Sequence, residues 1–147
     1  MNIEITRTIA AQPERVFRAL TDAGELPRWW TTRADSDART GGAFSYVFEF
    51  EDPARNHTYA GAYDAVVPSE RVRYPWGDSG TTVDFALRPA GDGTELTLQH
   101  EGFTDEEARS NHEQGWSFFL DNLKGWLETG ADARPAAPMG QKTGARV

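Results

Sequence analysis

Apolar and polar residues alternate at the start of the chain, which predicts a strand with one buried face. Its apolar face is formed by three residues of one parity, Ile3, Ile5 and Ile9. Pro13 then fits the first turn of a short helix, in which Val16 and Leu20 give an apolar stripe. A second short helix is expected from about residue 22 to residue 30, and Pro27 inside it keeps it short or kinked.

The period of two continues almost without interruption from residue 33 to residue 101. Inward positions are mostly aromatic or aliphatic and outward positions are polar, as expected for strands with one face in a core. Strand-like runs cover 44–50 and 58–67, among others. Turn-forming residues separate the runs at 52–53, 68–69, 77–80 and 92–93. Such short connections predict about six antiparallel strands joined as hairpins.

The period then changes to three and four, which predicts a long amphipathic helix over 104–129. Thr104 is expected to cap this helix, with Glu107 three residues later completing a capping box. Gly130 is expected to end it. Its apolar stripe is formed by residues three or four positions apart: Ala108, His112, Trp116, Phe119, Leu120, Leu123, Trp126 and Leu127.

The order of elements is therefore one strand, two short helices, about six antiparallel strands and one long helix. We predict an α+β fold in which a curved antiparallel sheet of about seven strands wraps around the C-terminal helix. A single domain is expected over residues 1–129. Residues 130–147 are rich in Gly, Ala and Pro and lack aromatic side chains, which predicts a flexible tail.

The amino-acid composition argues against several kinds of partner and functional site. The 147 residues include 23 acidic and 15 basic side chains, and the net charge of −8 argues against nucleic acid or an anionic membrane surface as a partner. The absence of cysteine excludes disulfides, thiolate metal ligands and a cysteine nucleophile. No apolar run is long enough to span a membrane, and the polar N-terminus lacks a signal-peptide core, so a cytoplasmic location is expected.

Two of the three histidines are candidate functional groups. His100 has the inward parity of its strand, and His112 lies one helical turn before Trp116, so the two rings can approach each other. A metal site needs a third ligand, and no acid shares these inward positions, so we expect no metal and no cofactor. Two interpretations stay open: the pair orients a ligand, or each ring is satisfied locally by a backbone carbonyl or a tryptophan.

Several segments resemble motifs of the START-like superfamily, also called SRPBCC, over about residues 3–127. They are the opening helix of 11–22, the Leu-Pro-Arg-Trp-Trp of 26–30, the turn of 37–44, the hairpin with Gly61, Pro68 and Trp76, and the His-Glu-Gln-Gly-Trp of 112–116. In this order they resemble the branch of homologues of the activator of the heat-shock-protein-ninety ATPase. The resemblance implies a helix-grip fold. Members of the superfamily bind lipids, hormones or polyketides, and a few are cyclases or hydrolases.

Many aromatic residues occupy inward positions, and three of the tyrosines among them carry hydroxyls that need partners or water when buried. This pattern favours a cavity with a few polar groups over a wholly dry core. We expect the cavity between the sheet and the long helix. Its expected lining is Trp30, Phe44, Tyr46, Phe48, Tyr63, Tyr74, Trp76, Phe85, Leu98, His100, His112, Trp116, Phe119 and Leu120.

Three functions are compatible with this picture. The leading expectation is a non-enzymatic protein that binds a small apolar or amphipathic molecule in the cavity, and the sequence identifies no catalytic residue. The second is a cyclase, dehydratase or hydrolase in the same pocket, with His100, His112 or a tyrosine as acid or base. The third is a protein-interaction module with a chaperone as partner. A homodimer is also left open, whereas no nucleic-acid or membrane partner is expected.

Overall fold

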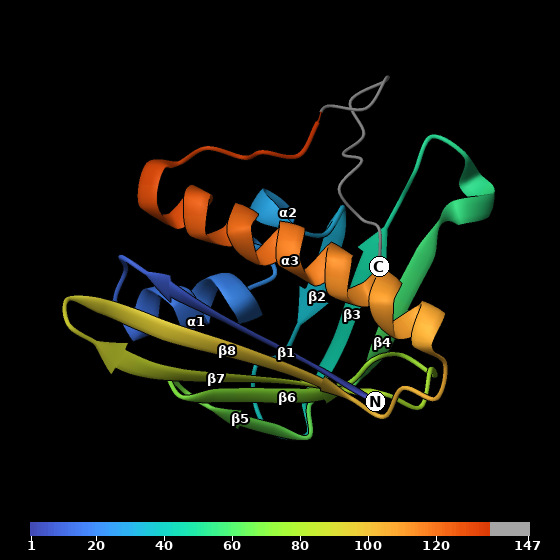
Figure 1. The fold of residues 1–147 in the computed structure, drawn as a ribbon, viewed down its shortest axis with the longest axis horizontal. Helices are drawn as coiled ribbons and strands as arrows, with labels where there is room; N and C mark the ends of the chain where they lie inside the picture. Colours follow the sequence, from blue (N-terminus) through green and yellow to red (C-terminus); the bar gives the residue numbers. More distant parts are fainter. Residues whose placement is uncertain (136–147) are drawn as a thin grey trace.

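The computed structural model describes residues 1–135, and its elements follow the predicted order (Figure 1). Within these residues the chain forms eight strands, three α-helices and one short 3-10 helix. Their bounds are β1 Asn2–Ile9, α1 Pro13–Thr21, α2 Leu26–Trp29, β2 Arg33–Ser36, β3 Ala43–Phe48, η1 Pro53–Arg55, β4 His57–Ala62, β5 Ala65–Val67, β6 Arg71–Pro75, β7 Thr82–Ala90, β8 Gly93–Glu101 and α3 Glu106–Thr129.

The strands hydrogen-bond in two antiparallel groups, and α3 runs across both (Figure 1). One group has five strands in the order β1-β8-β7-β6-β5, and the other has three in the order β2-β3-β4. The chain passes from one to the other at Tyr63 and Asp64. The Tyr63 amide donates to the Gly42 carbonyl oxygen (2.9 Å), whereas the Asp64 amide donates to that of Arg73 on β6 (2.8 Å). The single run predicted over 58–67 therefore divides here into β4 and β5.

The register of the five-stranded group places inward side chains in rows that cross the strands. One row contains Ile3 of β1, His100 of β8, Val83 of β7 and Tyr74 of β6. The next inward row is apolar throughout and consists of Ile5, Leu98, Phe85 and Val72. Because alternate residues of a strand share a face, both rows lie on the same face. His100 and Tyr74 are thus two polar side chains in an otherwise apolar surface.

The long helix α3 closes the interior and begins slightly later than predicted. Its N-cap is Asp105, whose side chain accepts a hydrogen bond from the Glu107 amide (3.2 Å), so the predicted capping box of Thr104 with Glu107 is wrong. Asp is as good a cap former as Thr, and its charge also suits the positive end of the helix dipole. Gly130 ends the helix at φ 79°, a left-handed conformation that glycine adopts without strain.

Polar side chains fasten α3 to β1 and to the residue after it. Arg7 Nε pairs with Asp121 Oδ1 at 2.6 Å, and Glu128 Oε2 accepts from the Ala10 amide at 2.8 Å. The helix is therefore held next to β1 by an ion pair and a hydrogen bond to the main chain, while its opposite face packs in the interior.

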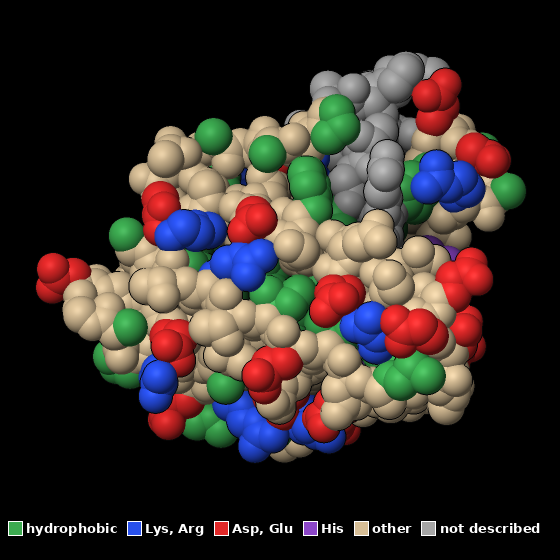
Figure 2. Space-filling model, viewed as in Figure 1, with side chains coloured by type: hydrophobic (Ala, Val, Ile, Leu, Met, Phe, Trp, Pro, Cys, Tyr) green, Lys and Arg blue, Asp and Glu red, His purple; other side chains and the backbone are tan. Residues whose placement is uncertain are grey.

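Figure 2 shows acidic and basic side chains interspersed over one face of the molecule. No helix in the described range is long and apolar enough to cross a membrane.

Residues 131–135, which the sequence places in the flexible tail, fold back onto the domain. Arg134 is only 5% exposed, and its guanidinium reaches main-chain oxygens at the end of α2. The other residues of the predicted tail, 136–147, lie outside the described part of the chain. The chain thus continues to pack on the domain beyond the end of α3, through Arg134.

Candidate functional site

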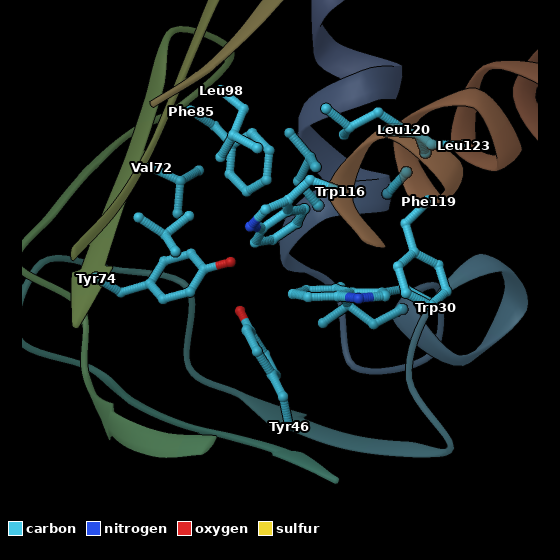
Figure 3. Close-up of a cluster of buried hydrophobic side chains, with 14 of the residues drawn as sticks. Trp30, Tyr46, Val72, Tyr74, Phe85, Leu98, Trp116, Phe119, Leu120 and Leu123 are labelled. Carbon is cyan, nitrogen blue, oxygen red and sulfur yellow. The ribbon is translucent and has the colours of Figure 1, made fainter. Parts of the chain in front are cut away.

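The interior between α3 and the two groups of strands is lined by aromatic side chains. Of the fourteen residues predicted to line a cavity, thirteen are at most 3% exposed, and the remaining one, His112, is half-buried. We call the thirteen buried residues the aromatic site. Figure 3 labels eight of them and shows that these side chains converge from β3, β6, β7, β8, α3 and the residue after α2. The sequence pattern therefore identified side chains that the fold does bring together.

Trp30 lies at the centre of the aromatic site and connects its walls. Its ring centroid is 5.2 Å from that of Trp116 on α3, 5.5 Å from that of Tyr46 on β3 and 5.8 Å from that of Trp76 after β6. The indole nitrogen Nε1 of Trp30 is buried and has no hydrogen-bond partner among residues 1–135. Ring packing therefore determines the orientation of the Trp30 side chain.

The backbone around Trp30 is held by a residue that the sequence analysis assigned to the tail. α2 is shorter than predicted, and Arg134 caps its end. The guanidinium donates to the carbonyl oxygens of Pro27 (2.8 Å) and Trp30 (2.9 Å), and it pairs with Asp132 (2.9 Å). The side chain of Arg134 is 1% exposed. A buried cation at the C-terminal end of a helix is favourable because unpaired carbonyl groups point toward it.

Asn122 of α3 completes this arrangement. Its Nδ2 donates to the Trp29 carbonyl oxygen (2.8 Å) and to Asp132 Oδ1 (3.0 Å), and its Oδ1 accepts from the Ala133 amide (2.6 Å). Although burial alone raises the pKa of Asp132, hydrogen bonds from Arg134 and Asn122 lower it to about 2. We call Asn122, Asp132 and Arg134 the clamp, because together they tie α2 to α3.

His100 occupies one end of the aromatic site, and both of its ring nitrogens are engaged. Trp116 Nε1 donates to His100 Nδ1 at 2.9 Å. Since an indole nitrogen only donates, Nδ1 carries no hydrogen, and Nε2 must donate to Thr81 Oγ1 at 2.8 Å. Burial, and then the neighbouring His112, lower the pKa of His100 to about 3. His100 is therefore a neutral ring with a fixed tautomer at pH 7.

A chain of hydroxyls continues from this ring to the backbone. Thr81 Oγ1 lies 2.7 Å from Ser79 Oγ, which donates to the Trp76 carbonyl oxygen at 2.6 Å. Because Thr81 accepts from His100, its own hydrogen is free to point to Ser79. We call His100, Thr81, Ser79 and Trp116 the histidine end of the site. Both ring nitrogens of His100, the hydroxyls of Thr81 and Ser79, and the indole nitrogen of Trp116 thus all have hydrogen-bond partners.

His112 lies beside His100 but bonds elsewhere. The two ring centroids are 5.6 Å apart, so the predicted approach of the rings is observed. His112 Nδ1 donates to the Ala108 carbonyl oxygen at 2.8 Å, within its own helix. Both rings are thus satisfied locally, which favours the second of the two interpretations left open by the sequence. No group of three or more potential metal ligands is found in the described part of the chain.

Three tyrosines form the other end, which we call the tyrosine end: Tyr46, Tyr63 and Tyr74. The Tyr46 and Tyr63 hydroxyl oxygens are 2.5 Å apart, and Ser36 Oγ lies 2.6 Å from Tyr63 Oη. The Tyr74 hydroxyl is buried and has no partner within residues 1–135. Figure 3 shows the hydroxyls of Tyr46 and Tyr74 pointing toward one another. Burial raises the pKa of both phenols well above the ordinary value, so both are neutral.

Sequence reasoning missed the small polar residues that complete both ends. Ser36 is the last residue of β2, Thr81 directly precedes β7, and Ser79 lies in a predicted turn, where a hydroxyl is common for local reasons. Their roles depend on residues far away in the chain, so no local signal could have identified them. Arg134 lies in a Gly- and Ala-rich stretch that has no periodic pattern.

A known protein family and several solved structures are similar to this chain. The family model for "Activator of Hsp90 ATPase homolog 1-like protein" matches residues 10–128. A solved structure from Chromobacterium violaceum is 32% identical, aligns over 86% of this chain and 97% of its own, and has a TM-score of 0.76. A protein from Staphylococcus saprophyticus is 20% identical over 92% and 98% of the two chains, with a TM-score of 0.79. The Aha1 dimer from Colwellia psychrerythraea is 24% identical over 88% and 98%, with a TM-score of 0.74.

No curated protein matches the chain in sequence. The TM-scores show that these solved structures share the fold of this chain, and the predicted α+β helix-grip fold is confirmed. The family match covers most of the described residues, from the residue after β1 to the last turn of α3. The chain therefore belongs to the family of Activator of Hsp90 ATPase homolog 1-like proteins.

Proposed function

We propose that the protein binds a small, largely apolar molecule in the aromatic site. Four buried side-chain polar atoms lack a partner within residues 1–135: Trp30 Nε1, Thr31 Oγ1, Tyr74 Oη and Trp76 Nε1. The observation that carries this proposal is that three of them, those of Trp30, Tyr74 and Trp76, belong to the aromatic site. Buried polar groups nearly always have partners, and leaving one unpaired costs about 1–3 kcal/mol. A bound molecule with a hydrogen-bond acceptor removes that cost. An apolar lining with a few polar atoms is also typical of small-molecule sites.

The superfamily fold supports the same function, because helix-grip proteins commonly bind hydrophobic ligands. An enzymatic role has less support. A general base needs an accessible nitrogen or carboxylate, but both nitrogens of His100 are engaged and its pKa is lowered to about 3. The buried phenols of Tyr46 and Tyr74 are neutral because burial raises their pKa, so they can donate a hydrogen bond but cannot act as bases at pH 7.

A protein-interaction role also has less support from the surface. Within residues 1–135, the large apolar side chains that are well exposed are Met1, Val67 and Phe118, and they lie on different elements. A docking surface normally needs a contiguous apolar patch. The dimer of the Colwellia relative supports a homodimer of this chain, which is compatible with ligand binding in each copy.

The proposal is tested with N-phenyl-1-naphthylamine, an uncharged aromatic probe that fluoresces in apolar surroundings. We expect saturable binding with one site per chain, and weaker binding to Trp30→Leu. The matched control is Phe118→Ala, which removes an exposed aromatic ring outside the site and is expected to bind like wild type. Circular dichroism verifies that each variant is folded. Absence of saturable binding, or equal binding to Trp30→Leu, would overturn the proposal.

A further inference from the structure

The tyrosine end contains more hydroxyl hydrogens than its internal hydrogen bonds use. Ser36, Tyr63 and Tyr46 form a chain of three hydroxyls joined by two hydrogen bonds. Each hydroxyl carries one hydrogen and can both donate and accept. Two hydrogens are used within the chain, and the third belongs to Ser36, to Tyr46 or, where Tyr63 accepts from both neighbours, to Tyr63. Tyr46 is free to donate into the aromatic site when it accepts from Tyr63, and it is free to accept there when it donates to Tyr63.

The exposure of the two ends makes this choice reversible. Ser36 is half-buried on β2, so its outer side can exchange hydrogen bonds with water as donor or acceptor. Tyr46 is fully buried, and its hydroxyl is directed toward that of Tyr74 (Figure 3). Rotating all three hydroxyls changes Tyr46 from acceptor to donor without breaking either hydrogen bond. Tyr46 can therefore match a donor or an acceptor in the site.

Tyr74 supplies a second hydroxyl at the same place. Its ring centroid is 5.6 Å from that of Tyr46, and the two rings are nearly perpendicular at 88°. The hydroxyl has no partner within the described chain. A single ligand oxygen between the two phenols can accept from both if it belongs to a carbonyl, or accept from one and donate to the other if it belongs to a hydroxyl.

The charges around the site restrict the ligand further. Within residues 1–135, the buried residues that can carry charge are Asp84, His100 and Arg134. Asp84 is paired with Arg71 and Arg73 at outward positions of the sheet, and Arg134 is paired with Asp132 in the clamp. His100 is neutral. An ionic ligand group would thus be buried without a counter-ion, which costs several kcal/mol.

We propose that the bound molecule carries an uncharged carbonyl or hydroxyl oxygen that Tyr74 and Tyr46 hold between them. This inference rests on the proposed function and adds the chemical class of the ligand: an uncharged, mostly ring-shaped ketone, quinone or phenol. Tyr74 and Tyr46 recognise its oxygen, and the aromatic site covers its apolar body. Carboxylates, sulfonates and ammonium compounds of the same shape are excluded.

The test compares two uncharged probes that differ in the oxygen. One is 6-propionyl-2-dimethylaminonaphthalene, a naphthyl ketone whose emission moves to longer wavelength when its carbonyl accepts a hydrogen bond. The other is N-phenyl-1-naphthylamine, which has no oxygen. In Tyr74→Phe we expect about fivefold to tenfold weaker binding of the ketone, the loss of one neutral hydrogen bond, with its emission shifted to shorter wavelength. Binding of the oxygen-free probe is expected to stay unchanged.

Tyr59→Phe is the matched control, because it removes a phenol hydroxyl from β4 outside the tyrosine end. It is expected to bind both probes like wild type. Tyr46→Phe is expected to change ketone binding in the same direction as Tyr74→Phe, which keeps the test valid if one variant is poorly folded. Equal ketone binding and emission in wild type and both variants would overturn the inference while leaving the proposed function intact. If neither probe binds to wild type, the proposed function itself fails.

A third probe tests the exclusion of charge. The compound 1-anilinonaphthalene-8-sulfonate is N-phenyl-1-naphthylamine with one added sulfonate. We expect it to bind at least tenfold more weakly than the uncharged parent, because its charge has no buried partner. Equal affinity for the two compounds would contradict the uncharged class of ligand.

Discussion

His100 and Tyr74 lie in one inward row of the five-stranded group, with Val83 between them. Their polar atoms nevertheless differ in whether they have hydrogen-bond partners. Both nitrogens of His100 are engaged, by Trp116 on one side and Thr81 on the other. The Tyr74 hydroxyl, equally buried, has no partner within residues 1–135. Burial is the same in both places, so burial cannot explain the difference. The histidine end has all its hydrogen bonds within the protein, whereas the tyrosine end leaves one buried hydroxyl without a partner in the described residues.

The clamp resembles the histidine end because its buried polar groups also have partners. Arg134 is a buried cation, but carbonyl oxygens and Asp132 surround its guanidinium. A fully paired buried group fixes the geometry around it, while an unpaired one raises the free energy of the empty site. This contrast leads to opposite expectations for substitutions at the two ends. Removing a paired group destabilises the fold, and removing an unpaired one does not.

The largest expected effect is that of Trp116→Ala. The Trp116 ring is fully buried, 5.7 Å from Phe85, and its Nε1 is the donor that fixes the tautomer of His100. Truncation should lower the free energy of unfolding by about 3–5 kcal/mol, as for other buried aromatic side chains. Binding of the uncharged probes should weaken with it. Chemical denaturation and probe titration measure the two effects.

The control for this prediction is Trp126→Ala. Trp126 is only half-buried near the end of α3 and lies under the guanidinium of Arg15, whose Cζ is 5.0 Å from the ring centroid. Trp126→Ala should lower the free energy of unfolding by less than Trp116→Ala does, and probe binding should stay unchanged. A Trp116→Ala protein as stable as wild type would show that the buried face of α3 is misassigned.

The next largest effect is expected for Arg134→Ala. It removes the cation from Asp132 and leaves the carbonyl oxygens at the end of α2 without their donor, which should lower stability by about 3 kcal/mol. Arg39→Ala, at an exposed ion pair with Asp37, should change stability by less than about 1 kcal/mol. Urea denaturation of both variants measures the difference. Similar midpoints for both would mean that the clamp does not hold α2 in solution.

Arg134 also shows where sequence reasoning fails. The strands and α3 were predictable because alternation with a period of two, or with three and four, is a local consequence of having one buried face. The burial of most residues of the aromatic site followed from these two periods, whereas Trp30, which follows the short α2, has no such pattern. The burial of Arg134 depends instead on carbonyl groups about a hundred positions earlier in the chain. The residues next to Arg134 in the sequence form no pattern that would predict such a contact.

Two smaller differences have similar causes. Thr104 and Asp105 are adjacent residues that both favour helix caps, so the sequence alone did not determine which of them begins α3. The division of the run at 58–67 depends on which strand each half pairs with, β3 or β6, and pairing is a property of the assembled fold. The open hydroxyl of Tyr74 has a related origin, because its lack of a partner is visible only when all neighbours are in place.

A pH titration of stability sharpens the comparison at the histidine end. The pKa of His100 is about 3 in the folded protein, against about 6.5 in an unfolded chain. Between these values the unfolded chain binds a proton that the folded protein does not. This contribution to stability is therefore fully present above pH 6.5 and decreases as the pH falls toward 3, by up to about 1.4 kcal/mol per pH unit.

His100→Gln should remove that part of the pH dependence. At pH 7 it should also lower stability by about 2 kcal/mol, since the Trp116 and Thr81 partners lose their fitted ring. His57→Gln, at an exposed position of β4, should keep the wild-type slope. Denaturation midpoints between pH 4 and pH 7 measure these slopes. Parallel curves for wild type and His100→Gln would show that His100 is not held neutral by the fold.

The smallest effect on stability is expected at Tyr74, although Tyr74→Phe is expected to weaken binding of the ketone probe. Tyr63→Phe removes hydrogen bonds to Tyr46 and Ser36 and should destabilise the ligand-free protein by about 1 kcal/mol. Tyr74→Phe removes a hydroxyl without a partner, so stability should stay the same or rise by up to about 1 kcal/mol. Both are measured by urea denaturation after extraction of any bound molecule. A clear loss of stability in Tyr74→Phe would mean that its hydroxyl is already paired in the ligand-free protein, and the two ends would then no longer differ.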